Sequence, residues 1–437
     1  MVSDVRPLRE LCSLIADCPH STPAWTDSGY IVIRNQHIKN GRLDLSTPSF
    51  TDAEHFAHRI RRAKPTVGDI IFTREAPMGE VCLVPPGLEC CVGQRQVLLR
   101  PDPSVVDGRF LLFALQSPQV QHEIAWNEGT GSTVSNVRIP VLEALRIPTP
   151  PLEIQREIGV VLGTLDDRIE LLSQTNSTLE SIAQALFRSW FIDFDPVRAK
   201  AEGREPEGMD AETAALFPSE FEESELGAIP KGWSVSEIGK AVDCVGGGTP
   251  STREATYWEP PVHHWATPKD LSGLCSPVVL DTDRRLSNEG LAKVSSGLLP
   301  VGTLLMSSRA PIGYLAITEV PLAINQGFIA MVPGGVLPPG FLYFWCQTNM
   351  DGIKQKANGS TFMEISKAAF RPIPLVVPSQ PVVAKFSALI GPIFKRISAN
   401  EQHRGNLSDL RDALLPRLIS GQLRLRGCHE LHEEALI

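Results

Sequence analysis

The sequence predicts an α+β fold of two tandem globular domains of mixed α/β type, separated by a pair of long helices that form an antiparallel coiled coil. Two observations predict this internal pseudo-twofold repeat. The segment from Val67 to Gly79 reappears from Val301 to Gly313 without a gap, at an offset of 234 residues. After each copy, apolar residues recur with the 4-3 spacing of a coiled-coil seam over about 40 residues.

The length and the cysteine pattern limit the class of protein. A chain of 437 residues can form two or three domains with their own cores. No apolar run approaches the roughly 18 residues that a membrane-spanning helix needs, and the first ten residues lack the apolar stretch of a signal peptide. The nine cysteines include no C-x-x-C pair, which argues against a disulfide framework or a structural zinc site. We therefore expect a cytoplasmic protein that does not associate with membranes.

The net charge of −9 is concentrated in one segment. Residues 193–227 hold eleven acidic and three basic residues, a sum of −8, so the remaining 402 residues sum to −1. Local basic patches can therefore exist in the globular parts. A nearly neutral protein still binds DNA weakly by itself, which indicates that partners supply some of the phosphate contacts.

Each predicted domain has the same internal order. Short β-like runs punctuated by Gly and Pro are followed by a short helix near 109–126 or 340–356, and a proline-rich strand ends the domain. The matched positions extend over most of both copies: Thr22-Pro23 with Thr249-Pro250, Gln94 with Gln326, Phe110–Phe113 with Phe341–Phe344, and Gly131–Thr133 with Gly359–Thr361. The domains are therefore predicted at 1–151 and 228–378.

The long helices are predicted at 152–192 and 379–425, on either side of an acidic linker at 193–227. The seam of the first helix has one polar member, Asn176. An antiparallel pairing would place it near Asn400 and Arg404, in a polar layer that could fix the register. Alternatively, each helix packs only on its own domain and its polar residues are solvated. Ser379 suits an N-cap, and Gly391-Pro392 should kink or restart the second helix.

The region between the copies carries a family resemblance. The run from Phe191 to Lys200, and its continuation through Leu216-Phe217-Pro218 to Trp233, resembles the central region of the specificity (S) subunit of type I restriction–modification systems. The junction from Pro150 to Ile158 looks like that family's junction between a target recognition domain and a conserved helix, and Pro378–Val383 is a degraded version. The resemblance covers essentially the whole chain.

The resemblance implies a non-catalytic, DNA-binding subunit. Its two target recognition domains would each read one half of a bipartite, asymmetric site in double-stranded DNA. The two conserved helices would set the spacing of the half-sites and would dock two methyltransferase subunits, which restriction/motor subunits then join. This chain would hold no cofactor, whereas S-adenosylmethionine would bind the methyltransferase subunits, and ATP and Mg the motor-nuclease subunits.

A search for chemistry in the residues agrees with that expectation. The chain has no N-P-P-Y/F motif for amino-methylation, and Gly232 to Lys240 has the wrong spacing for a phosphate loop. His263-His264 and His55/His58 lack partners at metal-binding spacing, so we expect neither a catalytic nor a metal site. A self-sufficient restriction–methylation enzyme and an orphan DNA-binding regulator without methyltransferase partners are the alternative functions.

The candidate DNA-binding residues have side chains that pair with base edges or phosphates. Arg suits guanine, Asn and Gln suit adenine, and Ser or Thr suits phosphate. In the first domain they are Thr22, Arg34, Asn35, Gln36, His37, Arg59, Arg61, Arg62, Arg74, Arg95, Ser132 and Thr133. In the second domain they are Thr249, Thr267, Lys269, Ser307, Ser308, Arg309, Asn325, Ser360 and Thr361.

A comparison of the two copies separates shared from variable positions. Gln94 and Gln326 recur, so a shared structural hydrogen bond is the alternative to DNA contact. Arg34 and Arg309 could equally form surface salt bridges. Arg74 aligns with Ser308 and Glu75 with Arg309, and this swap is the best candidate for discrimination between half-sites.

Overall fold

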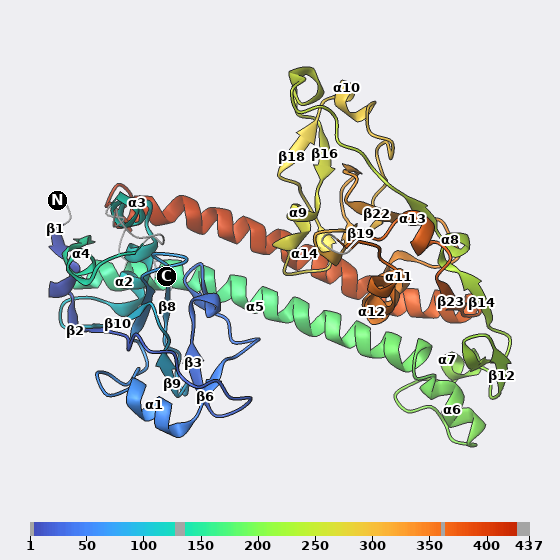
Figure 1. Ribbon diagram of the computed structural model, residues 1–437, viewed down its shortest axis with the longest axis horizontal. Helices are drawn as coiled ribbons and strands as arrows, with labels where there is room; N and C mark the ends of the chain where they lie inside the picture. The colour runs from blue at the N-terminus through green and yellow to red at the C-terminus, as the bar shows by residue number, and fades with distance from the viewer. Residues whose placement is uncertain (1–3, 127–135, 360–362, 426–437) are drawn as a thin grey trace, which may run out of the picture. The chain divides into compact units, whose positions relative to one another are not determined.

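The computed structural model describes residues 4–126, 136–359 and 363–425, and it divides into two compact units (Figure 1). The first unit comprises Met1–Ile169 and Asn406–Ile437, and the second comprises Glu170–Gly405. The boundary falls within the two long helices, α5 (Leu152–Phe191) and α14 (Gln380–Ile419). Each unit therefore contains one globular domain and a stretch of both helices.

The first unit contains a four-stranded sheet, a three-stranded sheet and two two-stranded pairs. Its strands are β1 (Asp4–Pro7), β2 (Cys12–Asp17), β3 (Tyr30–Ile33), β4 (Ile38–Lys39), β5 (Arg42–Leu43), β6 (Phe50–Thr51), β7 (Ile70–Thr73), β8 (Val81–Leu83), β9 (Cys90–Val92), β10 (Gln96–Pro101) and β11 (Arg146–Thr149). One sheet has the antiparallel order β2-β10-β7-β8, and the other has the order β6-β3-β9 with β3 parallel to β9. β1 pairs with β11, so the start of the domain closes on its end.

The second unit repeats this topology. Its strands are β12 (Phe221–Ser224), β13 (Gly227–Pro230), β14 (Ser234–Glu237), β15 (Asp243–Val245), β16 (His263–Ala266), β17 (Val278–Val279), β18 (Arg284–Leu286), β19 (Leu304–Ser308), β20 (Ile312–Thr318), β21 (Leu322–Ile324), β22 (Phe328–Val332) and β23 (Pro374–Val377). The order β15-β22-β19-β20-β17 extends the first sheet by one strand, β16 is parallel to β21, and β14 closes on β23. The predicted α+β repeat is confirmed.

Short helices complete both units. The first unit has α1 (Ala53–Arg59), α2 (Gly108–Gln116), α3 (Pro118–Trp126), α4 (Ile139–Ala144) and the 3-10 turns η1 (Leu8–Glu10) and η2 (Asn35–His37). The second has α6 (Asp195–Ala201), α7 (Ala211–Ala215), α8 (Ile238–Ala241), η3 (Ala255–Tyr257), α9 (Pro268–Ser272), α10 (Asn288–Leu291), α11 (Pro339–Thr348), α12 (Met350–Gln355) and α13 (Lys367–Phe370). In the part of the chain that the structure describes, no helix is long and apolar enough to cross a membrane.

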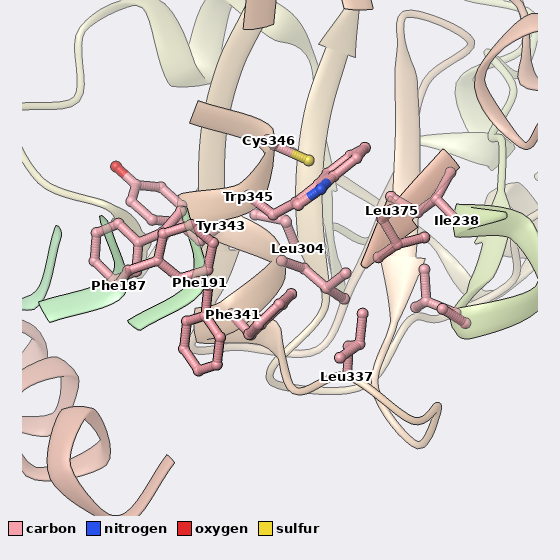
Figure 2. Close-up of a cluster of buried hydrophobic side chains, with 14 of the residues drawn as sticks. Phe187, Phe191, Ile238, Leu304, Leu337, Phe341, Tyr343, Trp345, Cys346 and Leu375 are labelled. Carbon is pink, nitrogen blue, oxygen red and sulfur yellow. The ribbon is translucent and has the colours of Figure 1, made fainter. Parts of the chain in front are cut away.

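Aromatic side chains from the long helices build the core of the second unit. Phe187 and Phe191 of α5 contact Phe341 of α11, with ring centroids 5.1 and 4.9 Å apart (Figure 2). Phe386 of α14 joins them, 5.0 Å from Phe191. Burying a side chain of this size stabilises the fold by about 1.5–3 kcal/mol. The helices are therefore part of the domain core as well as a pair.

The two long helices run antiparallel within each unit. In the second unit, the amide of buried Asn400 donates to Asn176 Oδ1 at 2.9 Å. In the first, Arg411 Nη1 lies 2.7 Å from Asp166 Oδ1. The predicted contact of Asn176 with Asn400 is confirmed, whereas Arg404 forms its ion pair with Glu401 of its own helix.

The prediction that Gly391-Pro392 restarts the second helix is wrong, because α14 is continuous from Gln380 to Ile419. A proline inside a helix removes one backbone hydrogen bond. The buried side chains of Phe386, Ile390 and Ile397 on both sides of that position anchor the helix in the seam and the core. This packing holds α14 across the missing bond.

The acidic segment 193–227 is ordered and belongs to the second unit. It forms α6, α7 and β12, and it ends at the first residue of β13. Its apolar residues Val197 and Phe217 are buried beside Trp190 of α5, whose ring lies 5.0 Å from that of Phe217. The acidic side chains of the segment therefore surround an apolar contact with the helix.

Candidate nucleic-acid interface

A polar hollow on the first unit collects several of the candidate residues. Its volume is about 430 Å³, and it lies where β3 passes into η2, beside the loop that follows β9. Its walls are formed by Thr22, Pro23, Trp25, Arg34, Asn35, Gln36, Ala76, Gln94 and Arg95. Segments far apart in the sequence therefore meet at one surface, as a DNA-reading site requires.

Arg34 and Trp25 form a stacked pair at this hollow. The Arg34 guanidinium lies 4.9 Å from the centre of the Trp25 ring, and 48% of Trp25 is exposed. Exposed aromatic and guanidinium planes are suitable surfaces for stacking on bases. Trp25 was missed by the sequence analysis, and its only sequence signal was a tryptophan near the shared Thr-Pro pair.

Arg95 lies at the hollow in an unusual backbone conformation. Its φ is +67°, in the left-handed region that non-glycine residues rarely adopt. Its Nε lies 3.1 Å from Glu75 Oε2, and its carbonyl accepts a hydrogen bond from the Arg74 amide at 2.8 Å. A conformation of this kind persists where surrounding contacts hold it, often at functional sites. The half-exposed Arg95 side chain is available at the surface.

Two positions shared by the copies, and Asn35 of the first copy, form hydrogen bonds inside the protein. Gln94 Nε2 donates to Thr22 Oγ1 at 2.9 Å, and in the second unit Thr249 Oγ1 donates to Gln326 Oε1 at 2.5 Å. The shared structural hydrogen bond that the repeat suggested is therefore present in both copies. Asn35 donates to the Glu75 carbonyl and accepts from Gln96 Nε2 at 3.2 Å. Its amide thus ties the edge of the hollow to the domain.

Arg59 and Arg74 are buried arginines. Arg59 is 2% exposed and donates to the carbonyls of Val92 and Ser21 at 2.9 and 2.7 Å. Burial lowers the pKa of its guanidinium. Arg74 is 8% exposed, and its Nη1 lies 2.8 Å from Asp17 Oδ1. Their guanidinium groups therefore bond to the protein in this conformation, and a DNA contact by either stays a prediction.

The other candidates in the first unit lie elsewhere. His37 is buried, its Nδ1 accepts from the Arg34 amide at 3.1 Å, and burial lowers its pKa. Arg61 and Arg62 are exposed just after α1, outside the walls of the hollow. Ser132 and Thr133 lie outside the described residues.

In the second unit, short polar residues surround the equivalent turn. Thr267 caps α9 through its Oγ1, 2.7 Å from Asp270 Oδ2. Asn325 Oδ1 accepts from the Gly327 amide at 2.8 Å, and the Asn325 amide donates to the Ala266 carbonyl at 3.0 Å. Lys269 is exposed, 3.1 Å from Asp283. Lys269 therefore presents the positive charge of this edge.

The swapped positions differ in exposure. Ser307 and Ser308 are 0% and 3% exposed, and Ser307 Oγ donates to the Pro311 carbonyl at 2.8 Å. Arg309 is half-buried, with Nη1 3.9 Å from Glu364 Oε2, and it lines a hollow of about 700 Å³ with Lys354. Since Arg74 and Ser308 are both buried, the exposed part of the swap is Glu75 against Arg309. Ser360 and Thr361 lie outside the described residues.

Among residues 4–126, 136–359 and 363–425, no cluster of three or more His, Cys, Asp or Glu side chains could hold a metal ion. The histidines that the sequence analysis considered have local partners. His55 Nδ1 lies 2.9 Å from Asp52, and His264 Nδ1 lies 3.1 Å from Asp281. Burial lowers the pKa of His264.

Comparisons with known proteins identify the family of this chain. Residues 3–181 and 230–399 match the family described as the type I restriction modification DNA specificity domain. The chain is 28% identical to the type I restriction enzyme HindI specificity subunit of Haemophilus influenzae, over 82% of this chain and 86% of the relative. It is 26% identical to the MjaIX specificity subunit of Methanocaldococcus jannaschii, over 82% and 78%.

A solved structure is similar to this chain in fold. The S subunit of a type I restriction-modification system from M. genitalium is 17% identical and has a TM-score of 0.57. The match covers 95% of this chain and 96% of that chain. At this identity the likeness concerns the fold alone, and it extends over both repeats.

Proposed function

Because this chain belongs to the family of the type I restriction modification DNA specificity domain, it is a non-catalytic DNA specificity subunit, and we propose that each repeat reads one half of a bipartite, asymmetric site. The observation that carries the proposal is the repeated topology with different exposed side chains. The first copy presents Arg34, Trp25 and Arg95 at a polar hollow. The second presents Arg309 and Lys354 at another. Two such surfaces would contact different bases.

Each part of the chain has a separate role in this proposal. Residues 1–151 and 228–378 would be the target recognition domains, residues 152–192 and 379–425 the spacer helices, and residues 193–227 a connecting segment. Each long helix has 40 residues, so it is about 60 Å long at about 1.5 Å per residue. A rod of this length could set the distance between two half-sites.

The helix α5 also offers a surface for partner subunits. Leu171, Thr175, Thr178 and Ile182 follow one another at spacings of four, three and four residues, which places them on one face of the helix. Leu171 and Ile182 are 50% and 54% exposed, although α5 already buries its other seam against α14. A second apolar seam on a paired helix suits another helix from outside the chain.

We propose that two methyltransferase subunits dock on the spacer helices, and that restriction/motor subunits join the assembled core in the cytoplasm. S-adenosylmethionine would bind the methyltransferase subunits, and ATP and Mg the motor subunits. This chain would supply recognition and distance only. Phosphate contacts by the partners would compensate for the nearly neutral charge of its globular parts.

Sequencing of methylated DNA tests the proposed function. A host without other adenine methylation should receive this chain together with the methyltransferase subunit encoded beside its gene. Methylation at one motif with two specified parts and an unspecified gap is expected, and the methyltransferase expressed alone should leave the DNA unmodified. A contiguous motif, or the same methylation without this chain, would contradict the proposal.

A further inference from the structure

A cavity of about 420 Å³ in the second unit lies between α5 and the globular domain. Arg42 of the first unit contacts α5, whereas none of the described residues that line the cavity of the second unit is an arginine. Glu180 of α5, Tyr343 and Gln347 of α11, and the short residues Cys275 and Ser276 line it. We propose that this cavity receives an arginine side chain from a partner subunit. The partner's identity rests on the proposed function, whereas the cation-binding character rests on the residues themselves.

The polar wall of the cavity has more oxygen atoms than hydrogen-bond donors to pair with them. Glu180 Oε1 accepts from the Tyr343 hydroxyl at 2.6 Å and from Gln347 Nε2 at 3.4 Å. Ser276 is 8% exposed, and its Oγ is buried without a hydrogen-bond partner, as is Gln347 Oε1. A buried polar atom without a partner is unfavourable, because it has lost its hydrogen bond to water. A group that carries several N–H donors and a positive charge would satisfy these oxygens.

The hydroxyl of Tyr343 marks the border between this polar wall and the apolar core. The Tyr343 ring centroid lies 5.2 Å from that of Phe344, and Figure 2 shows the hydroxyl oxygen directed away from the labelled apolar side chains. Burial, and then the adjacent Glu180 carboxylate, raise the pKa of this phenol. Tyr343 therefore stays protonated and donates its hydrogen bond to Glu180.

The first unit has an arginine on the corresponding part of its domain, where it contacts the helix that follows that domain. Its Gln116, which aligns with Gln347, lies against Gly41, the residue before Arg42. Arg42 Nη2 donates to the Asp166 carbonyl of α5 at 2.7 Å and lies 3.5 Å from the Asp166 carboxylate. An arginine of the domain thus spans the space to the helix.

The register of the strands shows which residue replaces this arginine. Ile33 of β3 pairs with Val92, and Ala266 of β16 pairs with Ile324, so these two strands are equivalent. Arg42 and Cys275 each stand nine residues after those strand ends. The second copy therefore has a short thiol side chain where the first has an arginine. One wall of the cavity is therefore formed by this thiol in place of an arginine.

The charge near the cavity supports an external arginine. Arg404 is close enough to Cys275 to interact with it electrostatically, but its guanidinium forms an ion pair with Glu401. The second oxygen of Glu180 takes part in none of the hydrogen bonds described among residues 4–126, 136–359 and 363–425. A planar guanidinium can bind a carboxylate through two parallel hydrogen bonds, which an ammonium cannot do.

Protection of Cys275 tests the cavity without any partner. Cys275 is exposed, whereas burial raises the pKa of Cys12 to about 12 and so suppresses its reactive thiolate. In the full chain carrying Cys428→Ser, N-acetylarginine amide should slow labelling of Cys275 by a neutral thiol reagent several-fold. The uncharged isostere N-acetylcitrulline amide should not, and Glu180→Gln should abolish the protection. Equal protection by both probes, or protection that survives Glu180→Gln, would overturn the cation site.

An arginine introduced into the cavity by mutation tests whether a partner subunit supplies the bound arginine. Cys275→Arg should place a guanidinium of the chain itself beside Glu180 and raise the melting temperature. It should also weaken assembly with the methyltransferase subunit by about tenfold or more, a change of about 1.4 kcal/mol, while the matched control Cys275→Gln should not. Unchanged assembly of the arginine variant refutes the partner arginine. If the wild-type chain itself fails to assemble, the proposed function fails, and the labelling result alone decides whether the cation site exists.

Discussion

A heptad added to each long helix should lengthen the distance between the two half-sites. The insertion duplicates residues 163–169 of α5 and residues 406–412 of α14, which lie opposite each other, since Asp166 bonds Arg411. Both copies of that ion pair can then form, and the 4-3 seam continues. Seven residues at about 1.5 Å each lengthen the helices by about 10 Å. At about 3.4 Å per base pair this equals roughly 3 base pairs.

The helical twist of DNA makes binding at the longer gap less favourable, because the added base pairs also rotate one half-site relative to the other. Three base pairs turn B-DNA by about 100°, given about 10.5 base pairs per turn. A 10 Å stretch of coiled coil with a pitch of about 150 Å turns by only about 25°. Loops and DNA twist must absorb the difference, so we expect weaker binding at the new optimum than the wild type shows at its own.

Methylome sequencing of a host that carries the variant and the methyltransferase subunit measures the gap. Both half-site sequences should stay the same, and the gap between them should grow by about 3 base pairs. A chain with the heptad in α5 alone is the matched control, because unequal helices cannot keep both Asp166–Arg411 and Asn176–Asn400 in register. An active variant that methylates at the original gap would refute the role of the helices as the spacer.

Three further predictions concern single contacts. Replacing both Asn176 and Asn400 by Leu should raise the melting temperature, because an apolar pair replaces a buried polar one. The same change should allow the two helices to pair in other registers. A single register, measured by cysteine cross-linking, would contradict the role of the polar layer. Arg74→Ala should destabilise the first unit by about 1–3 kcal/mol, because it removes the ion pair with Asp17 and the hydrogen bond to the carbonyl of buried Val137. Exposed Arg61→Ala should change the unfolding free energy by less than about 0.5 kcal/mol. Equal effects of the two substitutions in denaturant titrations would show that the contacts of Arg74 are unimportant for stability. Arg309→Ala should relax methylation at one half-site only, and equal loss at both half-sites would show a general phosphate or structural role.

The sequence by itself determined the architecture. The duplicated segments predicted two domains of one topology, and the paired strand orders confirm it. The seam in each long helix predicted their antiparallel pairing, including the contact of Asn176 with Asn400. These features depend on periodicity and on local residue choice, which can be read along the chain.

Only the tertiary structure decided which candidate side chains reach the surface. Arg34 and Arg74 look alike in the sequence, yet Arg34 stacks on Trp25 at an exposed hollow and Arg74 is buried against Asp17. Exposure depends on segments that are distant along the chain, and no local pattern encodes that. For the same reason the cavity beside Cys275 was missed, since it exists only because α5, α11 and a loop of the domain meet there.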